Sequence, residues 1–312
     1  MDNDIRNNKS LYIEDEIDLK ELLYALFQGK WLILFTILLF SIGGIVYSLS
    51  LPNIYKSHAL LYPTEQQTDI GGAMKAYSGL AGMAGINFSS QSAESNAVKA
   101  LEKVNSFSFF KENLLPNIFL PNLMAVDSWD KNTSSIKYDT NIFDESKNSW
   151  TRKVSYPKIL IPSAQESFEV FKGHINVFQE KDSGFVTISV KHESPLIAQK
   201  WTLLIVDQLN NYFRTKDKKE AEIAVSYLKN QIAQTSYTEI KQVIAQLMQS
   251  RTQQLTLIEV SKYYVFDYID PPIVMEKKSE PKRSVICILA AFYGLISGMV
   301  LVIFRYLISN KS

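Results

Sequence analysis

Residues able to do acid–base, nucleophilic or metal chemistry are few in this sequence and are poorly grouped. No histidine stands at metal-ligand spacing with a cysteine or a carboxylate, so we interpret the histidines as surface or strand residues. Asp267 and Asp270 are close in sequence, but the following Pro271 explains Asp270 as a turn residue. The three histidines are His58, His174 and His192.

Nucleophilic and cofactor motifs are not visible either. The single cysteine, Cys287, lies in an apolar run and cannot form an intramolecular disulfide, so an oxidising compartment is neither required nor excluded. A glycine-rich segment, residues 70–88, lacks both the Gly-Lys-Ser/Thr ending of a phosphate loop and the dinucleotide spacing. We interpret it as a flexible loop or a close-packing segment rather than a ligand site. The sequence therefore predicts no enzyme, no cofactor, and no catalytic, cofactor-binding or metal-binding residue, although a dispersed catalytic set stays possible.

The charge balance argues against a nucleic-acid partner. The chain has 33 basic and 32 acidic residues, with a formal net charge of +1. A nucleic-acid-binding protein usually shows a basic patch or stripe instead. Its 312 residues allow one large domain or two small ones.

Two uncharged apolar runs, residues 31–51 and 284–304, decide the class of protein. Each has the length of about 20 residues that crosses a bilayer as a helix. The first run begins 30 residues into the chain, behind an acidic region and without a clear cleavage site, which favours an anchor over a signal peptide. Buried core helices rarely run this far without a charge. The sequence thus predicts two transmembrane helices.

Two spans place both termini on one side of the membrane and residues 52–283 on the other. The tails are then residues 1–30 and 305–312. Basic residues occur on both sides, so the positive-inside rule gives no orientation.

Periodicity between the spans predicts an α+β fold. An amphipathic helix over residues 17–30, with Asp18 as N-cap, leads into the first span. Alternation predicts strands over residues 54–62 and 264–275 and a hairpin over 174–191. Shorter helices are predicted over 96–113 and 165–173, and residues 116–165 are mostly irregular.

The most informative element is a long helix predicted over residues 195–263. Neither proline nor glycine occurs between Pro195 and Pro271, and apolar residues recur at helical spacing. Such a helix would be roughly 100 Å long. A helix of this length packs in a coiled coil or against copies of itself. The predicted oligomer contacts are Leu228, Ile232 and Leu247.

Two further features lie at the C-terminal span. The prolines before it predict a stiff, extended linker, and the basic residues would contact anionic headgroups or glycan phosphate unless they are simply solvated. These residues are Pro271, Pro272, Pro281, Lys282 and Arg283. Small residues inside the span would allow close packing against the first span, another subunit or a polymerase, or reflect the general frequency of glycine there. They are Ala290, Gly294 and Gly298.

Three segments in order resemble the Wzz-type chain length determinants, or polysaccharide co-polymerases. The first joins IDLKELLYALFQGKW, the first span and LPNIYKSHALLYP. The second is DSGFVTISVKHESPLIAQKWTLLIVDQLN, and the third is FDYIDPPIVMEKKSEPKRS before the last span. Between residues 64 and 165 only GLAGMAGI contributes to the resemblance.

The resemblance implies a two-span protein of the bacterial inner membrane with both termini in the cytoplasm. It implies a periplasmic α/β base domain with a long extended helix, and ring-like homo-oligomers. The implied role is to set the length of a lipid-linked glycan, typically O-antigen, beside the membrane polymerase. Some relatives carry a cytoplasmic kinase domain. The eight residues that follow Phe304 contain no nucleotide motif and no tyrosine cluster, so we expect no kinase activity in this chain.

Three alternatives stay open at this point. A co-polymerase for capsule or exopolysaccharide export would work with a separate kinase. A periplasmic sensor or binding protein also places a domain between two spans, but a sensor needs a large output domain that the short C-terminal tail does not provide. A hydrolase with a dispersed site would need two carboxylates converging in a pocket.

Overall fold

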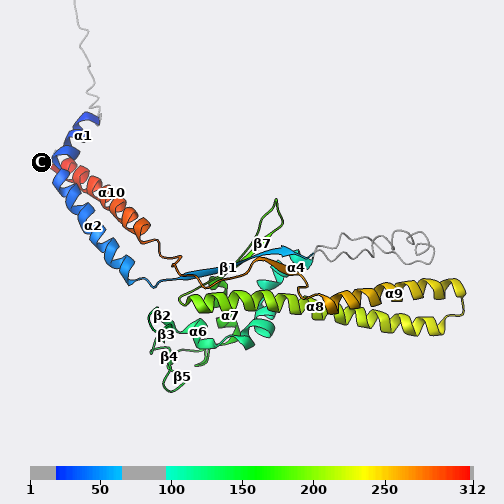
Figure 1. The fold of residues 1–312 in the computed structure, drawn as a ribbon. Coiled ribbons are helices and arrows are strands. Elements are labelled where there is room, and N and C mark those ends of the chain that lie inside the picture. The colour runs from blue at the N-terminus through cyan, green and yellow to red at the C-terminus, as the bar shows by residue number, and fades with distance from the viewer. Residues whose placement is uncertain (1–18, 65–95, 310–312) are drawn as a thin grey trace, which may run out of the picture. The chain divides into compact units, whose positions relative to one another are not determined.

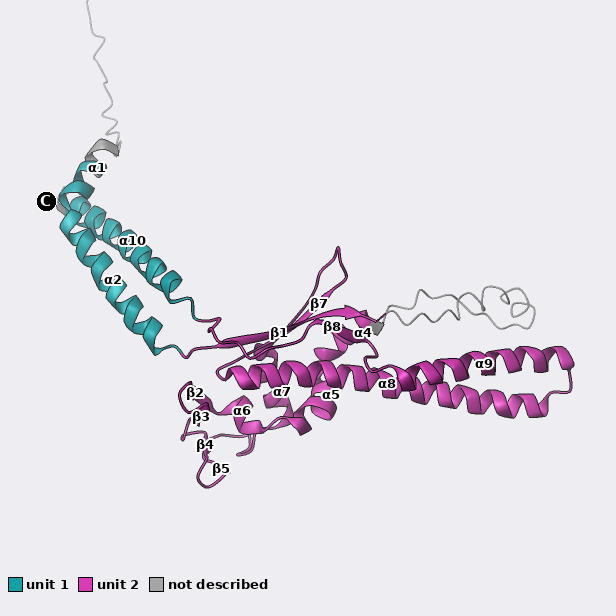
Figure 2. Ribbon diagram, in the orientation of Figure 1, with its two compact units in different colours: residues 1–51, 281–312 teal, residues 52–280 magenta. Residues whose placement is uncertain are grey.

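The computed structural model describes residues 19–64 and 96–309 and divides into two compact units. Unit 1 contains residues 1–51 and 281–312, and unit 2 contains residues 52–280 (Figure 2). The proposed Asp18 cap, the glycine-rich segment and the end of the C-terminal tail lie outside the described residues.

Unit 1 is a pair of long apolar helices preceded by a short one. Helix α1 (Leu19–Gln28) ends at a turn, and α2 (Lys30–Ser50) pairs antiparallel with α10 (Arg283–Ser309). Both long helices are long and apolar enough to cross a membrane. Only 11% and 17% of their most apolar windows are buried, whereas a core helix of a soluble protein would be mostly buried. The helices agree with the predicted spans, and α10 continues five residues further than predicted.

Unit 2 is built on a four-stranded antiparallel sheet with strand order β6-β7-β1-β8. The strands are β1 (Tyr55–Pro63), β6 (Ile175–Gln179), β7 (Val186–His192) and β8 (Phe266–Asp270). Along β1, alternate residues are buried, because successive side chains point to opposite faces of a sheet. The mixed helix and strand fold is thus confirmed, although β8 is shorter than the strand predicted over 264–275.

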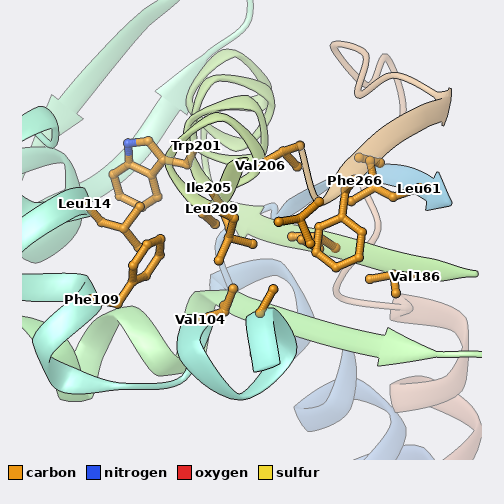
Figure 3. Close-up of a cluster of buried hydrophobic side chains, with 14 of the residues drawn as sticks. Leu61, Val104, Phe109, Leu114, Val186, Trp201, Ile205, Val206, Leu209 and Phe266 are labelled. Carbon is orange, nitrogen blue, oxygen red and sulfur yellow. The ribbon is translucent and has the colours of Figure 1, made fainter. Parts of the chain in front are cut away.

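The core of unit 2 lies between this sheet, the first half of α8 (Pro195–Gln234) and a group of short helices (Figure 3). The helix predicted over 96–113 is in fact α4 (Asn96–Val104) followed by α5 (Phe107–Phe109) and a π-helical turn (Phe110–Leu114). A break occurs because Ser106 Oγ accepts a hydrogen bond from Phe109 N and caps a new helix. A 3₁₀ turn (Leu115–Asn117) and α7 (Ala164–His174) complete the group. Fully buried members include Leu61, Phe109, Leu114, Ile205, Leu209 and Phe266.

A small lobe occupies much of the stretch predicted to be irregular. Helix α6 (Leu120–Met124) leads into two hairpins, β2 (Val126–Asp130) with β3 (Ser135–Tyr138), and β4 (Phe143–Asp144) with β5 (Ser149–Trp150). Short strands without clear alternation give little sequence signal, which explains why the hairpins were not predicted. We call residues 120–150 the β2–β5 lobe.

The predicted helix over 195–263 is wrong in its extent. It is two helices, α8 and α9 (Thr238–Val260), which fold back on each other as a hairpin (Figure 1). The backbone is extended at Thr235 and Tyr237, and the break needs neither proline nor glycine. A β-branched residue and a serine weaken the helix there, and folding back lets the two apolar stripes bury each other. A long helix of 40 residues, α8, does remain.

Asn210 fixes the closing strand to α8. Its Oδ1 accepts hydrogen bonds from the backbone N–H groups of Tyr264, Val265 and Phe266, at 3.1, 2.7 and 3.0 Å. Its Nδ2 donates to Phe266 O at 3.0 Å. Because Asn210 is buried, these bonds satisfy backbone groups that would otherwise lack a partner at the start of β8.

Candidate functional site

The small residues of the second span lie against the first span of the same chain. A Cβ atom added to Gly294 would lie 2.9 Å from Ile37 Cα, and one added to Gly298 would lie 2.9 Å from Ile33 Cα. Ala290 meets Gly44 in the same register. Among the contacts considered from sequence, the structure therefore displays the one between the two spans; a larger side chain at either glycine would push the helix backbones apart.

The membrane-proximal prolines belong to two segments. Pro271 is exposed and Pro272 is buried directly after β8, and Gln199 Nε2 donates to Pro272 O at 3.0 Å. Farther along, Ile54 N donates to Glu280 O at 2.9 Å, which ties the two ends of unit 2 together.

Beyond that tie, the remaining three membrane-proximal residues belong to unit 1. Pro281 and Lys282 precede α10, and Arg283 is its first residue. The segment predicted as an extended linker is therefore paired at Glu280 with Ile54, the residue directly before β1.

The residues predicted as oligomer contacts lie on the α8–α9 hairpin. Leu228 and Ile232 are half-buried on α8, and Leu247 is half-buried on α9. They belong to the less exposed stripe of each helix, and because the two helices pack along each other, we infer that this stripe is the contact face of the hairpin.

Two of the three histidines lie together at one end of the sheet. The His174 and His192 rings are 5.8 Å apart, and each makes a T-shaped contact with the Trp201 ring. His192 Nε2 donates to Asn122 O at 2.8 Å, and its Nδ1 accepts from Ser194 N at 2.9 Å. Sequence alone could not pair them, because α7 and β7 bring them together.

His192 is held neutral. Its pKa is lowered from 6.5 to about 4, mainly by burial and also by the neighbouring His174. The Nε2–H tautomer satisfies both ring nitrogens, so the Glu193 carboxylate 3.8 Å away does not form an ion pair with it at neutral pH. His58, the third histidine, lies exposed on β1. The histidine pair is thus a structural feature of the sheet end.

A shallow cavity of about 410 Å³ adjoins the histidine pair. Its lining includes Lys56, His174 and Lys191, and the two lysines stand directly opposite each other across β1 and β7. Like charges in such a pair repel. Glu280 offsets the repulsion, because its Oε1 lies 2.5 Å from Lys191 Nζ. The lysines also lie near the C-terminus of α7, where positive charge is favourable.

The residues that line this cavity include no carboxylate. A second, apolar groove lies between α2 and α10, and its lining residues include no carboxylate either. Over residues 19–64 and 96–309, no group of three or more His, Cys, Asp or Glu side chains is placed to hold a metal ion. Asp267 accepts a hydrogen bond from Tyr62 at 2.9 Å. Asp270 is the last residue of β8 and pairs with Leu60 of β1, so the structure places it in a strand and the turn interpretation is wrong.

Two solved structures are similar to this chain at low sequence identity. Among solved structures, a full-length bacterial polysaccharide co-polymerase is 13% identical with a TM-score of 0.41, over 94% of this chain and 99% of that one. A fragment of WzzB, a polysaccharide co-polymerase from Salmonella Typhimurium, is 11% identical with a TM-score of 0.29, over 73% of this chain and all of that fragment. Comparison with curated protein sequences found no match.

The family comparison gives the clearest result. Residues 15–121 match the family model described as chain length determinant protein, Wzz. The matched segment runs from the N-terminal amphipathic helix through α2 and β1 to the short helices of the core. It includes the first of the three segments on which the sequence resemblance depends. The resemblance is thereby confirmed over residues 15–121, which match the chain length determinant (Wzz) family model.

Proposed function

We propose that this chain regulates the length of lipopolysaccharide O-antigen as a non-catalytic, oligomeric scaffold beside the membrane polymerase. The observation that carries the proposal is the family match over residues 15–121, which includes a candidate span and the central strand of unit 2. The second candidate span, α10, supports the same architecture, because two spans bracket a folded unit of 229 residues, Pro52–Glu280.

In this proposal both termini are cytoplasmic and unit 2 is periplasmic, in the bacterial inner membrane. The two spans support the anchoring, since a pair of antiparallel membrane helices returns the chain to its starting side. The glycine contacts of α10 with α2 would hold the pair together.

Oligomer contacts would use the outward side of the hairpin, by which we mean the exposed surface of α8 that includes Ile223 and Tyr227. They would also use the residues predicted from sequence, Leu228, Ile232 and Leu247. Ile223 and Tyr227 lie one turn apart on α8 and are about 60% exposed, outside the stripe that contains Leu228. Tyr237 and Ile240, near the hairpin turn, are exposed too. A second copy would remove this apolar surface from water, which favours association.

A polymerase helix would dock on the open side of the span pair. The groove there is largely apolar and has a volume of about 740 Å³. Gly43 contributes a flat surface to it, because a Cβ atom added at that residue would meet nothing within 4 Å. Close approach of a third helix to such a surface is sterically possible.

The test is genetic. The gene is deleted, and the lipopolysaccharide of the strain is separated on a gel with and without this sequence on a plasmid. We expect the O-antigen ladder to lose its modal cluster on deletion and to regain it with the plasmid. An unchanged ladder would contradict the O-antigen role. Analysis of capsule and exopolysaccharide length in the same strains then tests the other glycan classes.

A further inference from the structure

An exposed apolar loop joins β5 to α7. Residues 151–163, which we call the apolar loop, expose five large apolar side chains, and Tyr156 at the centre is 97% exposed. The segment contains three basic residues and no acidic residue. The exposed apolar side chains are Val154, Tyr156, Ile159, Leu160 and Ile161. The basic residues are Arg152, Lys153 and Lys158.

Polar contacts beneath the loop hold it in one conformation. Arg152 binds the Glu166 carboxylate through both terminal nitrogens, at 2.5 and 2.9 Å. The same guanidinium donates to Leu160 O at 2.8 Å and Ile159 O at 2.6 Å. A bidentate pair of this kind adds geometric specificity. These contacts anchor the loop backbone at both Ile159 and Leu160, while the apolar side chains stay exposed.

The apolar loop belongs to the end of unit 2 at which the chain enters and leaves. Tyr55, the first residue of β1, contacts Trp129 of the β2–β5 lobe edge to face at 5.4 Å. In the same lobe Phe143 contacts Trp150, which directly precedes the loop, at 5.3 Å. Figure 2 shows the lobe beside the start of β1 and away from the turn of the α8–α9 hairpin.

The short connections to α2 and α10 limit how far this end of unit 2 can lie from the ends of the two candidate spans. Four residues separate the end of α2 at Ser50 from Tyr55. A fully extended chain covers at most about 3.6 Å per residue, so Tyr55 stays within about 18 Å of the end of the span. The connection to α10 is similarly short, because Glu280 pairs with Ile54 only three residues before Arg283.

We propose that the apolar loop inserts into the interfacial region of an anionic lipid membrane and forms a third membrane contact of each chain. Tyrosine and branched apolar side chains fit the boundary between headgroups and acyl chains, and the lysines fit anionic headgroups. A second copy of the chain is the less favoured occupant, because Glu166 is already paired with Arg152 and the exposed lysines of the loop would need further acidic partners from that copy. The inference rests on the membrane anchoring proposed above.

Site-directed fluorescence tests the contact on the full chain. Cys287 is replaced by serine, and a single cysteine at Tyr156 or Ile161 carries an environment-sensitive label. A label at Tyr237, which is also exposed but lies near the hairpin turn, is the matched control. The chains are reconstituted in phosphatidylcholine vesicles with or without phosphatidylglycerol, and nitroxide lipids serve as quenchers. Flotation with the vesicles separately reports anchoring by the spans.

We expect nitroxide lipids to quench labels at 156 and 161 severalfold more than the label at 237, most strongly with phosphatidylglycerol. Removing a charge at Lys153 or Lys158 with glutamine should weaken insertion about fivefold for each lysine. Labels at 156 and 161 that stay as accessible to aqueous iodide as the control would overturn the proposal. Protection from iodide without lipid quenching would also overturn it, and would assign the loop to a protein contact.

Discussion

Single side chains fix the geometry of unit 2 at places where the apolar pattern does not. Asn210 is a buried amide on a helix face otherwise occupied by apolar residues such as Leu209 and Phe213. The sequence signal for it exists, since a polar residue in the buried stripe of a helix requires a partner. The partner could not be predicted, because the three N–H groups lie 54 to 56 residues further along the chain.

Substitution of Asn210 by alanine should therefore destabilise unit 2. Three backbone donors and one acceptor would lose a partner in a buried site, and we expect unfolding to require about 2–4 kcal/mol less free energy. Thermal unfolding of the full chain in detergent, followed by circular dichroism, measures the change. Asn230→Ala on the exposed side of the same helix is the control and should have little effect. Equal melting of both variants would refute the role of Asn210.

His192 predicts a pH dependence of stability. Its folded pKa of about 4 lies below the ordinary 6.5, so between these values the unfolded chain binds the proton more readily. Stability contributed by the neutral ring is present above pH 6.5 and is lost as the pH falls towards 4, by about 3 kcal/mol in all.

Comparison of His192→Gln with the parent chain isolates this contribution. Glutamine does not titrate, so the variant's melting temperature should fall less between pH 7 and pH 5 than that of the parent. Melting curves in detergent across this range are the measurement. Parallel pH profiles would show that another group carries the dependence.

At the scale of elements, the spans and the start of the long helix could be predicted because uninterrupted patterns determine them. The hairpin turn at 235–237 could not, since nothing in Gln234–Thr235–Ser236–Tyr237 forbids a helix. Burial of one apolar stripe against another decides the break, and that gain appears only when both helices are considered together. The β2–β5 lobe could not be predicted for a related reason. Its strands are individually very short, and they are supported by contacts between distant residues, such as that of the Trp129 ring with the Tyr55 ring.

The contact between the spans predicts unequal effects for two glycines. Gly298→Leu would force side-chain atoms against the backbone at Ile33, whereas Gly43→Leu would enter open space. We expect Gly298→Leu to weaken the helix pair on the order of 1–3 kcal/mol and Gly43→Leu to leave it intact. Loss of helical signal during titration with SDS measures this difference. Similar midpoints for the two variants would refute the packing.

At the scale of the whole molecule, the proposed scaffold depends on association through the outward side of the hairpin. Ile223→Glu combined with Tyr227→Glu would place two charges on this surface without entering the stripe that faces α9. We expect the particle mass in detergent, measured by light scattering, to fall while the melting temperature stays unchanged. Asn230→Glu with Gln234→Glu adds the same charge at the same spacing on exposed positions and should leave the mass unaltered.

The O-antigen length distribution made by these two double variants tests whether association of subunits sets glycan length. Each is expressed in the deletion strain at matched protein levels in the membrane fraction. We expect Asn230→Glu with Gln234→Glu to restore the modal cluster, whereas Ile223→Glu with Tyr227→Glu should give a ladder without one. A dissociated Ile223→Glu, Tyr227→Glu chain that restored the normal cluster would contradict the claim that association of subunits sets glycan length.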